Sequence, residues 1–308
     1  MPGHPPGPRH LSATSSARSG AGTTLNPHQY CKDLVRKHDY EGFLTSQLYP
    51  PQFQSGYYAL RAFYVELSMI KEAVSQTTLG QTRLVFWRET VKNVFDGKPP
   101  RHPVALALYE ATQISRLPSY HFTRMIEARE QELHLQSHLT VDSMVSHAES
   151  TASTFLYLVL SLLSLPSATL SHAASHVGVA QSFATFLRAL PFHASKGAMV
   201  IPAEITAKHG VNQQDVFSSS RSSKPLEDAV FEFATIANDN LITARNMFTD
   251  MGGKVPREAI PVFAAAIPVA YVLRRLEAVD FNVYHPSLQT RDWKLAWQVW
   301  RYYYNRTF

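Results

Sequence analysis

The stretch YPPQFQSGYYALRAFYVELSMIKEAV, from Tyr49 to Val74, decides the fold class of this chain. Its apolar residues recur three and four positions apart, which is the spacing of a helix that turns one face toward a protein core. The stretch therefore predicts a long core-facing helix. The residues that set this period are Leu60, Phe63, Tyr64, Leu67, Ile70 and Val74.

The rest of the chain beyond Leu25 follows a similar helical period. It contains no sustained strand-like alternation and no Asn-Gly or Asp-Gly turn between β-branched runs. The sequence therefore predicts an all-α, single-domain helical bundle without internal repeats, in which the serine-rich segment 215–226 is a mobile loop. Further helices are expected within 79–97, 103–116, 120–138, 141–165, 172–190, 226–249, 256–279 and 292–304.

Residues 1–28 differ in composition from the helical domain that we expect over residues 29–308. This region is rich in proline, glycine and serine, and no acidic residue precedes Asp33. Arginine and serine without acids are typical of a mitochondrial transit peptide, and the lack of an apolar segment excludes a secretory signal. We expect a transit peptide here, with a disordered tail as the alternative.

The charge and cysteine content limit the classes of partner and site. The chain has 29 basic and 24 acidic residues, a formal net charge of +5 that no long basic run concentrates. This balance suits an anionic membrane surface or an acidic partner, and nucleic acid is not expected because no zinc-finger or RNA-reading signature is present. The single cysteine, Cys31, excludes an internal disulfide and any site that needs several thiolates.

Two apolar runs, 155–165 and 259–273, are the longest in the chain and the only candidates for a membrane span. Both are shorter than the roughly 18–20 residues that a spanning helix needs. Pro261 and Pro268 also interrupt the second run. We therefore expect a soluble or peripheral protein, with the first run in its core.

A second stretch, FLRALPFHASKGAMVIP from Phe186 to Pro202, joins the first in a family resemblance. Together with the Pro-Pro and ALRAF segment of the first stretch, it resembles the active-site helices of squalene and phytoene synthases. The segment TRLVFWRETVKNVFDGKPPRHPVALAL is also similar to this family. The resemblance covers most of the chain and implies the all-α isoprenoid synthase fold.

Most of the reactive positions of that family carry other side chains here. The ionisation of an allylic diphosphate needs Mg²⁺ held by oxygen ligands, and Glu72 is the one expected carboxylate that remains. The resemblance therefore implies no metal site, no cofactor and no catalytic residue. The family's acids fall on Ser68, Met69, Ala189 and His193, and its asparagine falls on Thr185.

Three segments resemble a mitochondrial group within this family more closely. They are RAFYVELSMIKEAVSQTTLGQTRLVFWRETV, SHAASHVGVAQ and VDFNVYHPSLQ. This resemblance implies a non-catalytic role in the early assembly of respiratory complex I, with complex I subunits or assembly intermediates as partners. It also implies a location on the matrix side of the mitochondrial inner membrane, with peripheral membrane association.

Two other functions stay open. A prenyl or lipid transferase with altered ligands would depend on Glu72, His193 and Lys196. A non-catalytic lipid-binding protein would use the former prenyl cavity, because the family counterparts of these residues face that cavity from opposing helices. We expect such a pocket, for a bound lipid or a partner's side chain, to involve Phe63, Ser68, Met69, Glu72, Thr185, Phe186, Ala189 and His193.

The C-terminal run RDWKLAWQVWRYYYNRTF places three tryptophans on one helix stripe. Trp293, Trp297 and Trp300 follow the spacing i, i+4 and i+7, and cations such as Arg301 flank them. The stripe either seals the bundle core or contacts a membrane interface or a partner, because aromatic and basic side chains favour that boundary.

Two pairs of histidines are spaced four residues apart, within 134–138 and within 172–176. Such a pair binds Zn²⁺ only when a third protein ligand converges, and the chain has no HExxH motif or cysteine-rich context. No metal is therefore expected at these histidines.

Overall fold

The structure is a computed structural model that describes residues 26–74, 76–135, 137–219, 221–290 and 293–308. The secondary structure of these residues is helical and includes no strand, so the all-α prediction is confirmed. Three 3₁₀ turns (Ser46–Leu48, Thr249–Met251, Arg257–Ala259) and one π-helical segment (Glu149–Ser153) join longer helices. The α-helices are α1 (Pro27–His38), α2 (Tyr40–Thr45), α3 (Pro51–Ala73), α4 (Thr77–Phe95), α5 (Pro103–Ile114), α6 (Ser119–His134), α7 (Val141–Ala148), α8 (Thr154–Leu162), α9 (Ala168–Ala194), α10 (Ala203–Lys208), α11 (Gln213–Ser219), α12 (Lys224–Asn246), α13 (Ile260–Phe263), α14 (Ala266–Glu277), α15 (Pro286–Gln289) and α16 (Lys294–Asn305).

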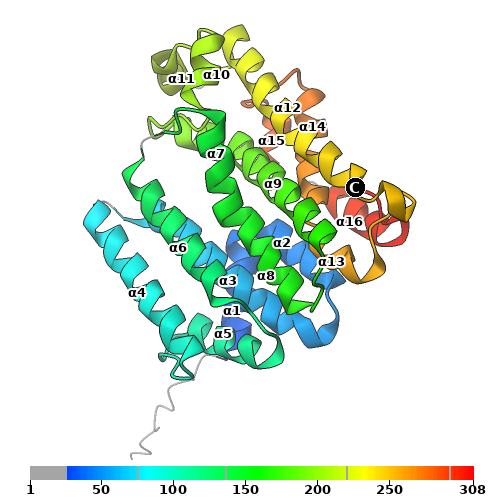
Figure 1. The fold of residues 1–308 in the computed structure, drawn as a ribbon. Helices are drawn as coiled ribbons and strands as arrows, with labels where there is room; N and C mark the ends of the chain where they lie inside the picture. Colours follow the sequence, from blue (N-terminus) through cyan, green and yellow to red (C-terminus); the bar gives the residue numbers. More distant parts are fainter. Residues whose placement is uncertain (1–25, 75, 136, 220, 291–292) are drawn as a thin grey trace, which may run out of the picture.

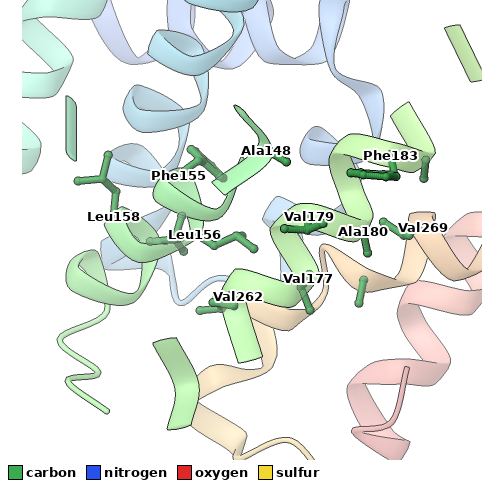
Figure 2. Close-up of a cluster of buried hydrophobic side chains, with 14 of the residues drawn as sticks. Ala148, Phe155, Leu156, Leu158, Val177, Val179, Ala180, Phe183, Val262 and Val269 are labelled. Carbon is green, nitrogen blue, oxygen red and sulfur yellow. The ribbon is translucent and has the colours of Figure 1, made fainter. Parts of the chain in front are cut away.

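Helices α3, α8 and α9 form the centre of the bundle (Figure 1). Helices α4, α5 and α6 pack beside α3, whereas α12 and α14 pack against α9, and α16 packs on α14. Figure 2 shows one part of the core, in which side chains of α8 and α9 gather with Val262 and Val269. The two stretches that carry the family resemblance therefore belong to central helices.

Helix α3 has the core-facing pattern that its sequence predicts. Leu60, Phe63, Leu67 and Ile70 are buried, and Tyr64 is half-buried and packed against the core. Burial also extends around the middle of this helix, where every residue from Tyr57 to Phe63 is buried. The helix therefore runs through the bundle and contacts neighbours on all sides.

A π-helical turn interrupts what the sequence predicts as one helix over residues 141–165. The extra residue of a π turn widens the helix locally. The Ser153 hydroxyl in this turn donates a hydrogen bond of 2.8 Å to the carbonyl of Ser175 on α9. Gly178 of α9 lies against the same turn, so the two helices approach closely here.

The predicted helix over residues 256–279 is broken between α13 and α14. The two parts are bent by 50° at Ala264 and Ala265. Pro268 lacks the N–H that a continuous α-helix would direct at the Ala264 carbonyl, which explains the break. Among the described residues, no single helix is long and apolar enough to cross a bilayer, and only the bent pair 257–263 and 266–277 meets that criterion when taken together.

The prediction of a loop over residues 215–226 was wrong for most of the segment. Helix α11 ends at Ser219 and α12 begins at Lys224. Val216 is 3% exposed and joins the core, which anchors α11 despite the serine-rich sequence that follows. Pro225 occupies the first turn of α12, where its missing N–H costs no hydrogen bond.

The predicted tail, residues 1–28, lies mainly outside the described residues. Helix α1 begins at Pro27, two positions before the predicted start of the domain. The Asn26 side chain accepts a hydrogen bond from the backbone N–H of His28 and so caps this helix. Residues 1–25, and with them the predicted transit peptide, are not described.

Candidate functional site

The C-terminal ends of α3 and α9 bring together two of the predicted site residues. Glu72 Oε1 lies 3.8 Å from His193 Nε2, and the two side chains are 48% and 23% exposed. Glu72 and His193 lie in the last turns of their helices, so their side chains meet near the surface of the bundle. With Lys71 and Lys196 they form a group of charged residues that we call the α3–α9 cluster.

The α3–α9 cluster has more positive than negative charge. Burial lowers the pKa of His193; Glu72 opposes this effect, and Lys196 and Lys71 add to it. The imidazole is therefore mainly neutral at pH 7. Lys71 donates a 2.8 Å hydrogen bond to the carbonyl of Leu135, which holds its ammonium group beside the cluster.

A largely buried ion pair lies on α6, and its carboxylate interacts electrostatically with Lys71 and His193 of the α3–α9 cluster. Arg129 and Glu132 of α6 are 2.7 Å apart, and His147 of α7 is 3.7 Å from the same carboxylate oxygen. Burial alone would raise the pKa of Glu132, but Arg129 and His147 lower it to about 2. Burial lowers the pKa of His147 to about 4, although Glu132 acts in the opposite direction. This group is therefore an ionised Arg–Glu pair beside a neutral histidine at pH 7.

Arg61 occupies the middle of α3 and forms a second buried ion pair, with Asp39. Its guanidinium also lies over two aromatic rings, 5.2 Å from the centre of Tyr64 and 4.7 Å from that of Phe155. Burial opposes the charged form of Arg61, but the Asp39 carboxylate raises its pKa above the ordinary value. A cavity lined by Arg61 and Phe155 has a volume of only about 10 Å³, space for at most one water molecule.

Phe63 does not share a space with the other predicted pocket residues. Its ring centre lies 5.2 Å from that of Trp87 and 5.4 Å from that of Phe122, so it packs toward α4 and α6. Phe63 precedes Glu72 by nine residues, or two and a half helical turns, so the two side chains lie on opposite sides of α3. The prediction of Phe63 as a pocket residue is therefore corrected to a core residue.

The remaining predicted positions lie along α3 and α9. Ser68 and Met69 are half-buried, and the Ser68 hydroxyl donates a 2.8 Å hydrogen bond to the carbonyl of Val65. Phe186 and Ala189 are half-buried, whereas Thr185 is exposed. Thr185 lines a small surface pocket with Arg188 and Glu41, which form an ion pair.

The α3–α9 cluster offers a poor set of ligands for Mg²⁺. Glu72 supplies its one carboxylate, and His193 offers nitrogen. Mg²⁺ prefers oxygen ligands in octahedral geometry, and neighbouring Lys71 and Lys196 oppose a cation. Within the described ranges, no group of three or more histidine, cysteine, aspartate or glutamate side chains could hold a metal ion.

The tryptophan stripe of α16 faces outward. Trp293, Trp297 and Trp300 are 77%, 47% and 58% exposed. Leu295 and Tyr302 instead bury the opposite side of the helix, together with Val299. The alternative in which the tryptophans seal the core is therefore wrong, and the stripe is a surface feature.

The sequence analysis missed both buried ion pairs. A signal was available for Arg61, because a charge inside the apolar run YYALRAFYV requires a buried partner. Its partner Asp39 could not be chosen from the sequence, since it lies 22 residues away at the junction of α1 and α2. Arg129 and Glu132 have the i, i+3 spacing of an ordinary surface pair, and only the packing of α6 shows that they are buried.

Comparison with known proteins agrees with this architecture. A family model described as squalene/phytoene synthase matches residues 35–301. A solved structure of a squalene synthase from Alicyclobacillus acidocaldarius superposes with a TM-score of 0.72 at 16% identity, covering 83% of this chain and 95% of that chain. At this identity the superposition establishes the fold alone.

Two curated proteins are similar to this chain over nearly its whole length. A protein of Rattus norvegicus is 37% identical over 92% of this chain and 85% of its own length. A protein of Homo sapiens is 35% identical over 98% of this chain and 89% of its own length. Both are named NADH dehydrogenase (ubiquinone) complex I, assembly factor 6.

Proposed function

This chain belongs to the squalene/phytoene synthase family, and from that premise we propose that it promotes the assembly of respiratory complex I without catalysing a reaction. The names of its rat and human relatives support the assembly role. Complex I subunits or assembly intermediates are the partners in this proposal. Fold membership alone does not determine function, so the rest of the argument depends on the residues of the site.

The observation that carries the non-catalytic part is the chemistry of the residues at the family's reactive positions. We propose that the Mg²⁺-binding aspartates of the family have been lost at Ser68, Met69, Ala189 and His193. The single carboxylate of Glu72, next to two lysines, is a poor substitute for a set of oxygen ligands. Without metal ions to neutralise a leaving diphosphate, the main stabilisation of that transition state is missing.

The interior of the bundle supports the same conclusion. Arg61 with Asp39, and Arg129 with Glu132, place ion pairs between the helices, and the cavity beside Arg61 has a volume of only about 10 Å³. A buried charged group that loses its partner destabilises the fold, so these pairs cannot separate easily to admit an apolar prenyl chain. We infer that the protein acts through contacts of its outer surface and not through an internal cavity.

We further propose a mitochondrial location, on the matrix side of the inner membrane, with peripheral membrane association. The relatives' complex I names and the acid-free, arginine- and serine-containing start of the chain support mitochondrial import. The exposed tryptophans of α16 support contact with a membrane surface.

The second candidate is a prenyl or lipid transferase that uses altered ligands. The proximity of Glu72 and His193, with Lys196 close by, is the specific observation that favours it. In this alternative the lysines would take the place of Mg²⁺ next to an anionic leaving group. A lipid-binding protein without catalysis is the third candidate, and it requires space for the lipid beside Ser68, Met69, Phe186 and Ala189.

The test is complementation of cells that lack this chain, followed by native-gel analysis of complex I and of the other respiratory complexes as controls. We expect selective loss of complex I, restored equally by the unmodified chain and by the double variant Glu72→Gln with His193→Asn. Rescue by the unmodified chain alone would favour the transferase. Normal complex I in cells without the chain would overturn the proposal.

The third candidate is tested separately by mass spectrometry of the purified chain. Lipid extracted in a one-to-one ratio from the unmodified chain, and lost on Ala189→Trp, would establish a binding pocket between α3 and α9. The non-catalytic assembly proposal predicts that no stoichiometric lipid is recovered from this place.

A further inference from the structure

An open pocket lies between α12, α14 and α16, separate from the α3–α9 cluster. Its volume is about 550 Å³. Each of the three helices contributes one arginine to its lining, namely Arg245, Arg274 and Arg301, and Glu277 is its single acidic lining residue. The apolar part of the wall includes Phe231, Ile267, Leu273, Phe281 and Phe308.

The three arginines bring positive charge together in one pocket. Arg245 Nε donates to a main-chain oxygen of Phe308, the last residue of the sequence, and Arg274 Nε donates to the carbonyl of Ala270 at 3.2 Å. In the described part of the chain, Arg274 and Arg301 form no ion pair. Burial and the charge of Arg274 lower the pKa of Arg245. Arg245 is half-buried, whereas Arg274 and Arg301 are exposed. A bound anion stabilises guanidinium groups that share one pocket, and their planar donors suit phosphate.

The helix beside this pocket presents its aromatic residues to solvent. At 100° per residue, Trp297, Trp300 and Tyr304 project on the side of α16 opposite to the buried Leu295 and Val299. Their exposed fractions are 47%, 58% and 64%. Surface tryptophan and tyrosine side chains at one face are typical of the membrane–water boundary, where their rings lie at the level of the headgroups.

Arg301 connects the aromatic face with the pocket. Its guanidinium carbon lies 5.7 Å from the centre of the Trp297 ring, and the same side chain lines the pocket. No acidic residue occurs between Lys294 and Phe308. The face of α16 is therefore complementary in charge to an anionic bilayer.

We propose that the pocket of Arg245, Arg274 and Arg301 holds the phosphate of an anionic phospholipid, while the tryptophan face of α16 lies in the bilayer interface. This assignment rests on the peripheral membrane association proposed above and adds its lipid class and its surface. A free phosphate would use the arginines alone and would leave the exposed tryptophans without a role. The apolar part of the pocket wall matches the glycerol and upper acyl segments of a lipid.

The test is co-sedimentation of the full chain with phospholipid vesicles of two compositions. One contains phosphatidylcholine alone, and the other contains phosphatidylcholine with phosphatidylglycerol. We expect the chain to bind the anionic vesicles more tightly. The double variant Arg274→Gln with Arg301→Gln should bind the anionic vesicles roughly 30-fold less tightly and the neutral ones unchanged, since each arginine near an anionic surface contributes about fivefold.

Two matched double variants test whether binding depends on the proposed surface or simply on the number of arginine and exposed aromatic side chains. Arg301→Gln with Trp300→Ser removes one arginine and one exposed aromatic ring from the proposed surface. Arg116→Gln with Tyr120→Ser does the same at another open pocket, beside α6, where Tyr120 is 63% exposed. We expect only the α16 variant to lose binding, and an equal loss in both would overturn the proposal.

Three other results would also overturn it. They are equal binding to both vesicle types, saturable binding of inorganic phosphate without vesicle binding, and binding of α16 to a complex I subunit with no affinity for vesicles. If anionic vesicles do not bind but the chain still restores complex I, the lipid pocket fails and the assembly role stands. If the chain binds anionic vesicles but its removal leaves complex I normal, the lipid pocket stands and the assembly role fails.

Discussion

Gly178 of α9 lies directly against the main chain of Ser153 in the π-helical turn. A Cβ atom at position 178 would come within 2.4 Å of the Ser153 nitrogen, a distance that real Cβ contacts do not reach. The obstacle is backbone, so it cannot turn aside as a side chain can. The spacing of two central helices therefore depends on the absence of one methyl group.

We expect Gly178→Ala to destabilise the protein by about 1–3 kcal/mol, the usual cost of overpacking. The measurement is urea unfolding followed by circular dichroism. Gly56→Ala is the matched control, because the atom closest to its Cβ would be the end of the flexible side chain of Leu162, at 2.8 Å. A loss at position 178 no larger than that at position 56 would contradict the close contact.

The buried pair of Arg61 and Asp39 leads to a second prediction. Arg61→Met should lower the free energy of unfolding by about 3–5 kcal/mol, because it leaves the Asp39 carboxylate without its partner. The double variant Arg61→Met with Asp39→Asn should recover part of this loss, since no unpaired charge remains. Asp39 also caps α2 by accepting a 2.9 Å hydrogen bond from the Gly42 N–H, a role that asparagine can keep. Additive losses in a double-mutant cycle measured by urea unfolding would contradict the coupling.

A third prediction concerns the dependence of stability on pH. Burial lowers the pKa of His121 to about 4, and Arg124 adds to this effect. The unfolded chain therefore binds a proton more readily than the folded one, and stability falls as the pH decreases from 6.5 to about 4. The full difference between these pKa values corresponds to roughly 3 kcal/mol.

His121→Phe keeps a ring next to Tyr157 and removes the titrating group. We expect the unmodified chain to lose up to roughly 3 kcal/mol more stability than this variant between pH 7 and pH 4. The contribution of His147 is present in both proteins and cancels in the comparison. Identical pH profiles from urea unfolding would contradict the lowered pKa, because they would show that His121 binds a proton equally readily in the folded and unfolded states.

The two faces of α16 should differ in their effect on stability. Leu295→Ala removes a side chain that is 7% exposed and should cost about 2–5 kcal/mol. Trp300→Ser alters a side chain that is 58% exposed and should change stability by less than about 0.5 kcal/mol. Thermal unfolding of both variants checks this, and a large loss for Trp300→Ser would mean that the tryptophan packs on the domain.

Helical periodicity predicted the architecture well because it is a local property of the chain. The spacing of Leu60, Phe63, Leu67 and Ile70 defines a core face, and these four residues are buried. Periodicity does not detect a π turn, since the residues around Ser153 continue the apolar pattern. Nor did the serines after Val216 reveal that this valine is fixed in the core.

The candidate site could be predicted only in part. The matched stretches place Glu72 and His193 on facing helices, and the structure brings the two side chains to 3.8 Å. The side of α3 on which Phe63 lies follows from helical geometry and could have been worked out. The partner of Arg61 and the burial of the Arg129–Glu132 pair depend on how separate segments pack, and the outward direction of Trp300 depends on where α16 meets α14.

The outward face of α16 also gives this protein an internal fluorescence reporter. The chain has four tryptophans; Trp87 is 3% exposed in the core, and the other three are exposed on α16 or, for Trp293, at its N-cap. Emission from Trp87 should stay at short wavelength throughout, whereas that of the surface group should shift when water around it is replaced by another medium. Contact of α16 with a bilayer or a protein can therefore be followed spectroscopically in the unlabelled, unmodified chain.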